Sequence, residues 1–452
     1  MTASILGILL AAGEGTRMRS RSPKVLHHVA GRPMVGHVQS AMAEAGIATM
    51  ALVVGNGAEK VADTAKASYP ETQIFVQSER LGTAHAVLAA RDAIEQGFDS
   101  IVIGYGDTPL VTPGLFMSII NELQTGADVV VLGFHSENPT GYGRLIMDQG
   151  KLTAIREEKD ATPAERQITF CNSGIMGLSG PRALDLLDAI GNENAKGEFY
   201  LTDAVAVANA GGLDVRSVEG KEEDTLGVNN RIELAAAEAC LQERLRAKVM
   251  ENGVTLVDPN STFLSYDTEI GADTIIEPNC FFAPGVKIAE DVTIKANCYF
   301  EGDTKKGQFV TVASGAVIGP FARLRPGASL MSDVKVGNFC EVKNASVGRG
   351  AKINHLTYIG DATLGADANI GAGTITCNYD GFSKYITEIG EGAFIGSNSA
   401  LVAPVSIGDG AYIASGSVIT DNVSNDALAV GRGRQVQKDK WAAEMRAKRK
   451  DG

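Results

Sequence analysis

The sequence lacks the features that mark membrane, secreted and nucleic-acid-binding proteins. The apolar run Ile5–Ala12 follows no basic segment and is far shorter than the about 20 apolar residues that cross a bilayer. Acidic residues outnumber basic residues, 54 to 41, so the chain lacks the excess cationic charge on which general nucleic-acid binding depends. We therefore expect a cytoplasmic protein with no membrane span and no nucleic-acid partner.

Paired cysteines of the CxxC type are also missing. The six cysteines stand far apart, at positions 171, 240, 280, 298, 340 and 377. This spacing argues against a zinc ribbon or a thioredoxin-like redox site. We interpret the cysteines as reduced, mostly packed thiols of a cytoplasmic protein.

The length of 452 residues favours two domains, and the pattern changes near residue 250. Before that point, apolar segments at 5–12, 50–55 and 100–104 alternate with helix-like segments at 33–45 and 84–94. This alternation predicts an α/β, Rossmann-like domain with a mostly parallel sheet over residues 1–229. Residues 230–252 are rich in Ala, Leu, Glu and Arg and precede Gly253, which predicts a linker helix.

An internal repeat begins after Gly253. Aliphatic or aromatic residues recur at every sixth position in long sets that start at Leu264, Val312 and Ile389. A period of six fits neither a helix nor a single strand, and it predicts a coil of three short strands with one inward apolar side chain per face. The pattern resembles that of left-handed parallel β-helices, which we expect over residues 253–437.

Two polar insertions interrupt this repeat, at residues 301–309 and 374–388. Insertions in a solenoid form loops on one face, and such loops often carry function. Residues 438–452 form a basic C-terminal tail.

The first predicted strand leads into a glycine-rich turn, LAAGEGTRM at residues 10–18, which is followed by SPK at 22–24. The N–H groups of such a turn approach phosphates closely, and Arg17 and Lys24 add positive charge for a triphosphate. A dinucleotide-binding turn is the main alternative, but Met18 replaces its third glycine, and no GKS or GKT marks a Walker A loop. Asp107 follows another predicted strand, where a carboxylate is well placed to hold Mg²⁺ together with substrate phosphates.

Together these strings resemble sugar-1-phosphate nucleotidyltransferases. The segment QSERLGTAHA at 77–86 resembles the uridine-selecting stretch of the N-acetylglucosamine-1-phosphate uridylyltransferases, although Arg80 stands where Gln is expected. By this resemblance, Asp107 and Asn229 hold Mg²⁺, and Arg17 and Lys24 are catalytic. The substrate-binding residues that it implies are Leu10, Ala11, Ala12, Gly13, Lys24, Gln77, Gly82, Thr83, Tyr105, Gly106, Asp107, Gly143, Glu157, Asn172, Tyr200 and Asn229.

A second chemistry is suggested by NHLTYIGD at residues 354–361, inside the repeat. His355 stands at a predicted corner. The repeat predicts that Glu341 and Lys343 lie about two coils earlier. A neutral imidazole suits the removal of a proton from an amine, and a carboxylate such as Glu341 could fix its tautomer. A lone histidine is more often structural, so the surrounding strings matter.

Those strings, RLRPGA at 323–328, GNFCEVKNA at 337–345 and NIGAGTITCNYDG at 369–381, resemble glucosamine-1-phosphate N-acetyltransferases. The resemblance implies that Arg325, Lys343, Tyr358, Asn369 and Lys384 bind the hexosamine phosphate. It assigns the acetyl-CoA site to Ala372, Asn378, Tyr379, Ser397, Ser415 and Arg432.

The chain thus resembles, nearly end to end, the bifunctional family that joins both activities. The resemblance implies acetyl transfer from acetyl-CoA to glucosamine-1-phosphate, then uridylyl transfer from UTP to N-acetylglucosamine-1-phosphate with release of pyrophosphate, in a homotrimer. One alternative is a single-activity nucleotidyltransferase with a structural solenoid. Another is a non-catalytic scaffold, against which the presence of Arg17, Lys24, Asp107 and His355 argues.

Overall fold

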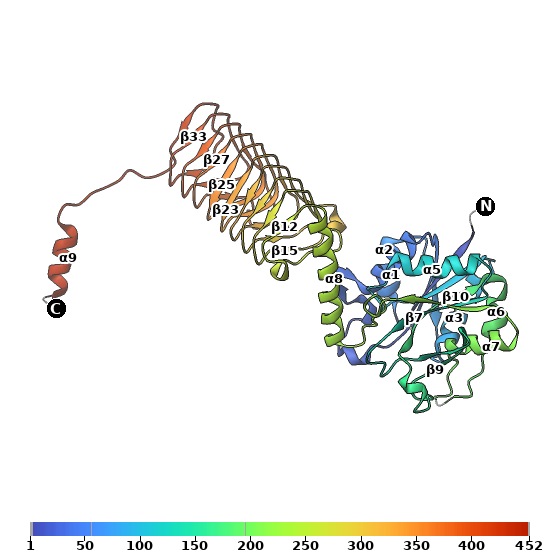
Figure 1. Cartoon of the computed structure of the whole chain (residues 1–452). Coiled ribbons are helices and arrows are strands. Elements are labelled where there is room, and N and C mark those ends of the chain that lie inside the picture. The colour runs from blue at the N-terminus through green and yellow to red at the C-terminus, as the bar shows by residue number, and fades with distance from the viewer. Residues whose placement is uncertain (1–2, 56, 195, 451–452) are drawn as a thin grey trace. The chain divides into compact units, whose positions relative to one another are not determined.

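The computed structural model describes residues 3–55, 57–194 and 196–450, and its contacts divide the chain into two compact units, Met1–Arg244 and Leu245–Gly452 (Figure 1). Helix α8 (Arg231–Glu251) contains the boundary between them, and it confirms the helix predicted over residues 230–252. No helix among the described residues is both long enough and apolar enough to cross a membrane.

The first unit is built on a sheet with the strand order β11-β7-β10-β6-β1-β4-β5. Neighbouring strands pair in parallel except where β10 lies antiparallel to β6 and β7, so the predicted mostly parallel sheet is confirmed. Strands β8 and β9 extend it as a hairpin beside β10. The strands are β1 (Ile5–Ala11), β4 (Thr49–Gly55), β5 (Gln73–Gln77), β6 (Ser100–Tyr105), β7 (Val129–His135), β8 (Arg144–Asp148), β9 (Lys151–Arg156), β10 (Phe170–Ser179) and β11 (Val215–Gly220), and β2 (His28–Val29) pairs with β3 (Arg32–Pro33) in a separate hairpin.

Helices cover both faces of this sheet because its central strands are apolar on both sides. Strand β1 shows this directly: Leu6, Ile8 and Leu10 belong to one buried core, and Leu9 and Ala11 belong to the other. The first core includes residues of α3 (Thr83–Leu88), α4 (Arg91–Ile94), α6 (Gly180–Asp188) and α7 (Ala204–Ala210), and the second includes residues of α1 (Met34–Glu44), α2 (Glu59–Ser68) and α5 (Pro113–Gln124).

The single helix predicted over residues 84–94 is wrong, because the structure has two short helices there. Helix α3 ends at Leu88 and α4 begins at Arg91. The alanines between them leave the regular pattern, and the amide of Ala90 bonds to the carbonyl of Val87 in a tighter turn. An alanine-rich, apolar segment gives no sequence signal for such a break.

The second unit is a coil of short parallel strands, as the six-residue period predicts. Ile276 pairs with Ile294, so one coil takes 18 residues there, which is three repeats. The in-phase positions point inward and are buried from Leu264 to Ile419, with Ile270 partly buried at the first coil. Glycines allow neighbouring coils to approach: a Cβ on Gly271 would lie 2.4 Å from the backbone nitrogen of Glu290.

The strands stack in three columns, and β24 and β26 run through one corner and belong to two of them. One column is β12 (Thr255–Leu256), β14 (Ile275–Ile276), β17 (Thr293–Ile294), β20 (Val317–Ile318), β23 (Lys335–Asn338), β25 (Lys352–His355), β27 (Asn369–Ile370), β30 (Phe394–Ile395), β33 (Tyr412–Ile413) and β35 (Leu428–Ala429). The second is β13 (Glu269–Ile270), β16 (Val286–Ile288), β19 (Val310–Val312), β22 (Ala328–Leu330), β24 (Glu341–Val347), β26 (Tyr358–Leu364), β29 (Thr387–Ile389) and β32 (Val405–Ile407). The third is β15 (Phe281–Phe282), β18 (Tyr299–Phe300), β21 (Arg323–Leu324), β24, β26, β28 (Ile375–Cys377), β31 (Ala400–Val402) and β34 (Val418–Ile419).

The predicted insertion at 301–309 forms a loop between strands. The second insertion is shorter than the predicted 374–388: its loop spans 378–386, because β28 and β29 take up residues at both ends of the predicted range. The predicted basic tail contains helix α9 (Trp441–Lys450). The exact domain limits stay a prediction.

Candidate active sites

The glycine-rich turn after β1 places Lys24 in the first unit's cavity. Gly15 has a φ of +62°, and a Cβ there would lie 2.5 Å from the Cβ of Lys24. Only glycine fits this left-handed, crowded position without displacing the lysine. The short 3₁₀ helix Lys24–Leu26 can therefore pack directly against the turn.

Three polar side chains from distant parts of the sequence meet beside this turn. The Lys24 ammonium forms an ion pair with Asp107 and donates to Oδ1 of Asn229 at 3.2 Å. The amide of Val228 donates to the carbonyl of Asp107 at 2.8 Å, which joins the two loops. A carboxylate and an amide oxygen that converge on one cation are ligands that suit Mg²⁺, so the residues present fit the predicted metal.

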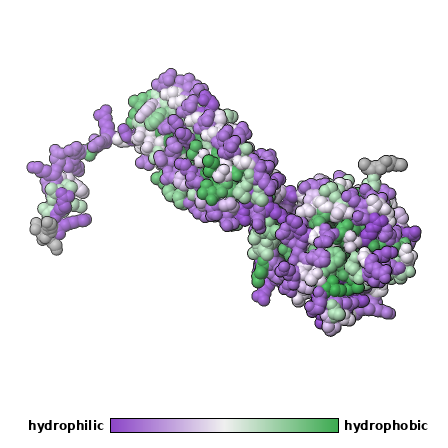
Figure 2. Space-filling view, in the orientation of Figure 1, coloured by the Kyte–Doolittle hydropathy of each residue, from purple (hydrophilic) through white to green (hydrophobic). Residues whose placement is uncertain are grey.

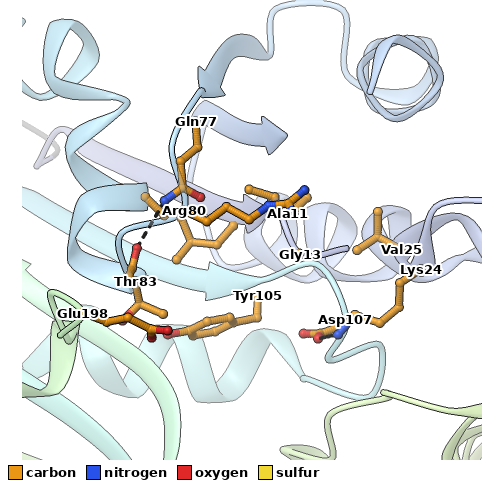
Figure 3. Close-up of a pocket in the computed structure, with 14 residues that line it drawn as sticks. Ala11, Gly13, Lys24, Val25, Gln77, Arg80, Thr83, Tyr105, Asp107 and Glu198 are labelled. Carbon is orange, nitrogen blue, oxygen red and sulfur yellow. Dashed lines mark hydrogen bonds and ion pairs between the residues drawn. The ribbon is translucent and has the colours of Figure 1, made fainter. Parts of the chain in front are cut away.

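A cavity of about 260 Å³ opens at the carboxyl ends of β1 and β6. Figure 3 shows Lys24 and Asp107 facing each other at one end, with Gln77 and Thr83 at the other. The structure brings these predicted residues together here: Leu10, Ala11, Ala12, Gly13, Lys24, Gln77, Gly82, Thr83, Tyr105 and Asp107.

Gly82 shapes the far end of this cavity. It has a φ of +122°, and a Cβ there would lie 2.4 Å from the carbonyl oxygen of Phe199. The Gln77 side-chain amide donates to the Gly82 carbonyl at 3.2 Å. The Thr83 hydroxyl accepts the Leu201 amide at 2.9 Å. These contacts hold the segments 77–86 and 197–203 together.

An adjoining cavity of about 510 Å³ shares Thr83, Tyr105 and Asp107 with the first. Its lining includes the residues predicted to face the sugar: Gly143, Glu157, Asn172 and Tyr200. Burial raises the pKa of Glu157, and the Lys196 ammonium opposes this effect. Burial likewise raises the pKa of Tyr105.

Three other predicted residues hold different positions. Arg17 is exposed in the 3₁₀ helix Thr16–Met18 and is not among the described residues that line either cavity. The amide of Gly106 donates to the Leu10 carbonyl at 2.9 Å, so it joins β6 to β1. Asn229 is not among the described residues that line the first cavity, but its Oδ1 accepts a hydrogen bond from the Lys24 ammonium, which does line it.

Our sequence interpretation missed Glu198, which lines both cavities, and Lys196, which lines the second. Glu198 lies two positions before Tyr200, which the resemblance assigns to the substrate, so the resemblance could have found it. The interpretation also left Arg80 without a partner. The structure pairs Arg80 with Glu14 of the glycine-rich turn at the rim of the first cavity.

In the second unit, basic side chains gather on neighbouring coils. The Arg325 guanidinium donates to Oε1 of Glu341 at 2.7 Å. The Lys384 ammonium beside Lys343, together with burial, lowers the pKa of Lys343. Three of the residues predicted to bind hexosamine phosphate therefore lie together, with one carboxylate among them.

The predicted partnership of Glu341 with His355 is not what the strand register shows. Glu341 lies opposite Tyr358, and Asn338 lies opposite His355. Glu341 instead pairs with Arg325 and, at 3.6 Å, with Arg323. The expected separation of about two coils was also wrong, because one coil takes 17 residues here and Glu341 is in the adjacent coil.

A buried carboxylate, Asp361, connects the coils behind this cluster. It accepts the Asn344 side-chain amide at 2.6 Å and also bonds the amide of Asn378. Asn378, predicted to face acetyl-CoA, is itself buried. Tyr379 beside it is exposed on the loop 378–386.

Most of the other predicted acetyl-CoA residues stack along successive coils. The Ala372 carbonyl accepts the Asn398 amide at 2.7 Å, and the Ser397 carbonyl accepts the Gly416 amide at 2.8 Å. The guanidinium of Arg432 donates to the Ser415 carbonyl at 2.7 Å. Asn369 lies in the same column as His355, on strand β27.

Comparison with known proteins agrees with both halves of this arrangement. The family model of MobA-like NTP transferase domains matches residues 7–168. The model of the bacterial transferase hexapeptide (six repeats) matches residues 267–302 and 386–421. The second unit is therefore a hexapeptide-repeat, left-handed parallel β-helix.

Several curated proteins named bifunctional protein GlmU are similar over almost their whole length. The one from Chelativorans sp. (strain BNC1) is 57% identical, over 99% of each chain. Those from Azorhizobium caulinodans and Agrobacterium fabrum are each 55% identical, over 99% and 100% of this chain and 98% of each relative. The chain therefore belongs to the family of bifunctional GlmU proteins.

Proposed function

We propose that this protein carries out two successive transfers on a hexosamine 1-phosphate. The second unit transfers an acetyl group from acetyl-CoA to glucosamine-1-phosphate. The first unit then transfers a uridylyl group from UTP to N-acetylglucosamine-1-phosphate, which gives UDP-N-acetylglucosamine and pyrophosphate. The observation that carries the proposal is that Lys24, Asp107 and Asn229 meet at a glycine-rich turn in one unit, while Arg325, Lys343 and Lys384 gather in the other.

In the acetyl transfer, the sugar amine attacks the thioester carbonyl carbon of acetyl-CoA. The new N–C bond forms, the C–S bond breaks, and the CoA sulfur leaves with the electron pair. The His355 imidazole takes the proton that the amine loses. Arg325, Lys343 and Lys384 hold the sugar phosphate, since clustered cations recognise a phosphate dianion.

In the uridylyl transfer, an oxygen of the sugar phosphate attacks the α-phosphorus of UTP, and pyrophosphate leaves in line. The nucleophile is already an anion, so the step needs no general base. The chain orients the reactants, and Lys24 and the turn amides stabilise charge that develops on the phosphates. Arg17, which is exposed next to the turn and lies outside the described lining of both cavities, would have to approach the triphosphate to add its charge.

Asp107 and Asn229 would hold Mg²⁺. The ion, when bound, neutralises charge on the triphosphate and on the leaving pyrophosphate. Gln77, Gly82 and Thr83 surround the end of the cavity that would take the uracil and ribose. Gly143, Glu157, Asn172 and Tyr200 line the part that would take the acetylated sugar.

We also propose that the protein is a cytoplasmic homotrimer that assembles through its solenoids. The solenoid exposes a ladder of aromatic side chains in which Phe281 and Tyr299 stack at 5.1 Å between ring centroids. Figure 2 shows hydrophobic residues among the polar ones on the visible face of this unit. Association of solenoids would cover such residues.

The direct test is to incubate the protein with glucosamine-1-phosphate, acetyl-CoA, UTP and Mg²⁺ and to detect UDP-N-acetylglucosamine by mass. His355→Ala should block product formation, and added N-acetylglucosamine-1-phosphate should restore it. Product from UTP and N-acetylglucosamine-1-phosphate, without any thiol release from acetyl-CoA, would instead support a single-activity nucleotidyltransferase with a structural solenoid.

A further inference from the structure

The imidazole of His355 has a specific hydrogen-bond partner in the preceding coil. Its Nδ1 lies 2.8 Å from Oδ1 of Asn338. The two residues are opposite each other in the pairing of β23 and β25. Each precedes a corner residue with positive φ, Phe339 at +56° and Leu356 at +51°. The same corner geometry in consecutive coils therefore aligns the two side chains.

This contact fixes where the imidazole proton lies. An amide oxygen only accepts hydrogen bonds, so the Nδ1 that faces it must carry the hydrogen. A neutral imidazole has one N–H, and the lone pair is then on Nε2 at the other side of the ring. We propose that Asn338 is a positioning residue for acetyl transfer, which holds His355 in the tautomer whose Nε2 accepts the amine proton.

The surroundings explain why an amide rather than a carboxylate has this role. Glu341, the carboxylate that follows Asn338 in the same coil, forms ion pairs with Arg325 and Arg323. The neutral amide of Asn338 selects a tautomer without adding a negative charge that would favour the imidazolium, which has no lone pair to accept a proton.

Lysines line the hollow that His355 borders. This hollow of about 510 Å³ lies between coils, and Lys295 and Lys335 line it. Lys352 lies on the same strand as His355. The residue that pairs with Lys352 on β27 is the uncharged Asn369.

The proposal rests on the proposed acetyl transfer, and substitution of Asn338 in the full-length protein tests it. Asn338→Asp places a carboxylate against Nδ1, which stabilises the charged imidazole. The acid limb of kcat/KM for acetyl transfer should move to higher pH by about one unit.

Asn338→Ala removes the hydrogen-bond acceptor that faces Nδ1, so both neutral tautomers of His355 become populated. The kcat should fall by about tenfold or more, with KM for glucosamine-1-phosphate and acetyl-CoA within about threefold. Hydrogen exchange of the solenoid peptides around β23 and β25 in the same samples reports whether the second unit of each variant is folded.

Asn354→Asp is the matched control. Asn354 lines the same hollow and precedes His355, so this change adds the same charge without replacing the group on Nδ1. Its pH profile should move less than that of Asn338→Asp. An equal movement in both variants would reduce the effect to general electrostatics and overturn the proposal.

A direct reading of the tautomer completes the test. In protein with ¹⁵N-labelled histidine rings, the signals that disappear in His355→Ala identify His355. They should show a protonated Nδ1 and a bare Nε2, and Asn338→Ala should shift them towards a mixture. A proton on Nε2 in the unchanged protein would contradict the proposal.

If His355→Ala retained acetyl transfer, the proposed base itself would be wrong. If that variant is inactive while Asn338→Asp and Asn338→Ala behave like the unchanged protein, only the role of Asn338 fails.

Discussion

The ammonium of Lys24 lies 3.2 Å from Oδ1 of Asn229, although 205 positions separate the two residues in the sequence. Lys24 follows the first strand, and Asn229 lies two residues before the start of α8. The amide of Asn229 donates to Glu233 in the first turn of α8 at 2.6 Å, so the start of that helix fixes the asparagine. The fold thus brings an early and a late segment of the first unit together beside the glycine-rich turn.

Replacement of Lys24 by Met should abolish uridylyl transfer and spare acetyl transfer. The side chain is 12% exposed and already faces Asp107, so its loss removes a preorganised cation where charge develops. We expect uridylyl transfer to fall by about 100-fold or more. Pyrophosphate release and thiol release, measured on one sample, check both halves.

Lys60→Met is the control, because Lys60 is exposed on α2. It should change neither activity. Equal loss of both activities in Lys24→Met would contradict two independent sites.

Glu14 and Arg80 should affect UTP binding in opposite directions. Glu14 lies in the turn that we expect to meet the triphosphate, and Arg80 pairs with it at the cavity rim. Glu14→Gln removes a repulsive charge and should lower KM for UTP, whereas Arg80→Gln should raise it. Both side chains are at least half exposed, so each change should be only about two- to fivefold. Initial rates at low and at high salt check this, since salt should reduce both effects. A shift of KM in the same direction for both variants would be evidence against the role of the pair.

The large features of the fold follow from the sequence because they depend on burial patterns. The solenoid could be predicted from positions such as Ile276 and Ile294, since a period of six leaves one inward side chain per strand. The break between α3 and α4 could not be predicted, because Ala89 and Ala90 fit a helix and a turn equally well.

The same distinction holds for the sites. Lys24 and Asp107 belong to contiguous strings that follow strands, so their meeting was predictable. The contact between His355 and Asn338 was not, because it depends on the length of one coil. A coil of 17 residues rather than 18 sets which side chain lies beneath the imidazole. Because of this short coil, Asn338 lies opposite His355, whereas the sequence predicts that Glu341 contacts the imidazole.

Phe300→Ala should strongly destabilise the solenoid. Phe300 is fully buried and stacks on Phe282 at 4.7 Å, with their rings nearly parallel. Loss of a buried aromatic ring typically costs about 3 to 5 kcal/mol. Since each coil contacts only its neighbours, the defect should weaken the adjoining coils as well.

Hydrogen exchange of solenoid peptides measures this effect in the intact protein. The adjacent Tyr299→Ala is the control, because Tyr299 is 38% exposed and points outward. Exchange in β15 and β21 should quicken much more in Phe300→Ala than in Tyr299→Ala. Similar exchange in the two variants would mean that the inner stack does not stabilise the coil.

His37 should make the first unit less stable in mild acid. Burial lowers the pKa of His37 to about 4, and its Nε2 donates to the Val29 carbonyl at 2.8 Å. In the unfolded chain the pKa of His37 returns to its ordinary value of 6.5. Above pH 6.5 both states are neutral at this residue, and its contribution to stability is complete. As the pH falls from 6.5 towards 4, only the unfolded chain takes up the proton, so up to about 3 kcal/mol is lost.

His37→Gln isolates this contribution from those of Glu157 and Asp203, whose pKa values are raised by burial. Glutamine keeps an N–H donor for Val29 but does not titrate. Between pH 7 and pH 5, hydrogen exchange of β1 peptides, corrected for the intrinsic effect of pH, should show a smaller loss of protection in the variant. The carboxyl groups have the opposite effect: their folded forms bind protons more readily, which adds stability as the pH falls. The unchanged protein must therefore lose more protection than the variant. A variant that loses as much would show that the histidine is already charged in the folded state.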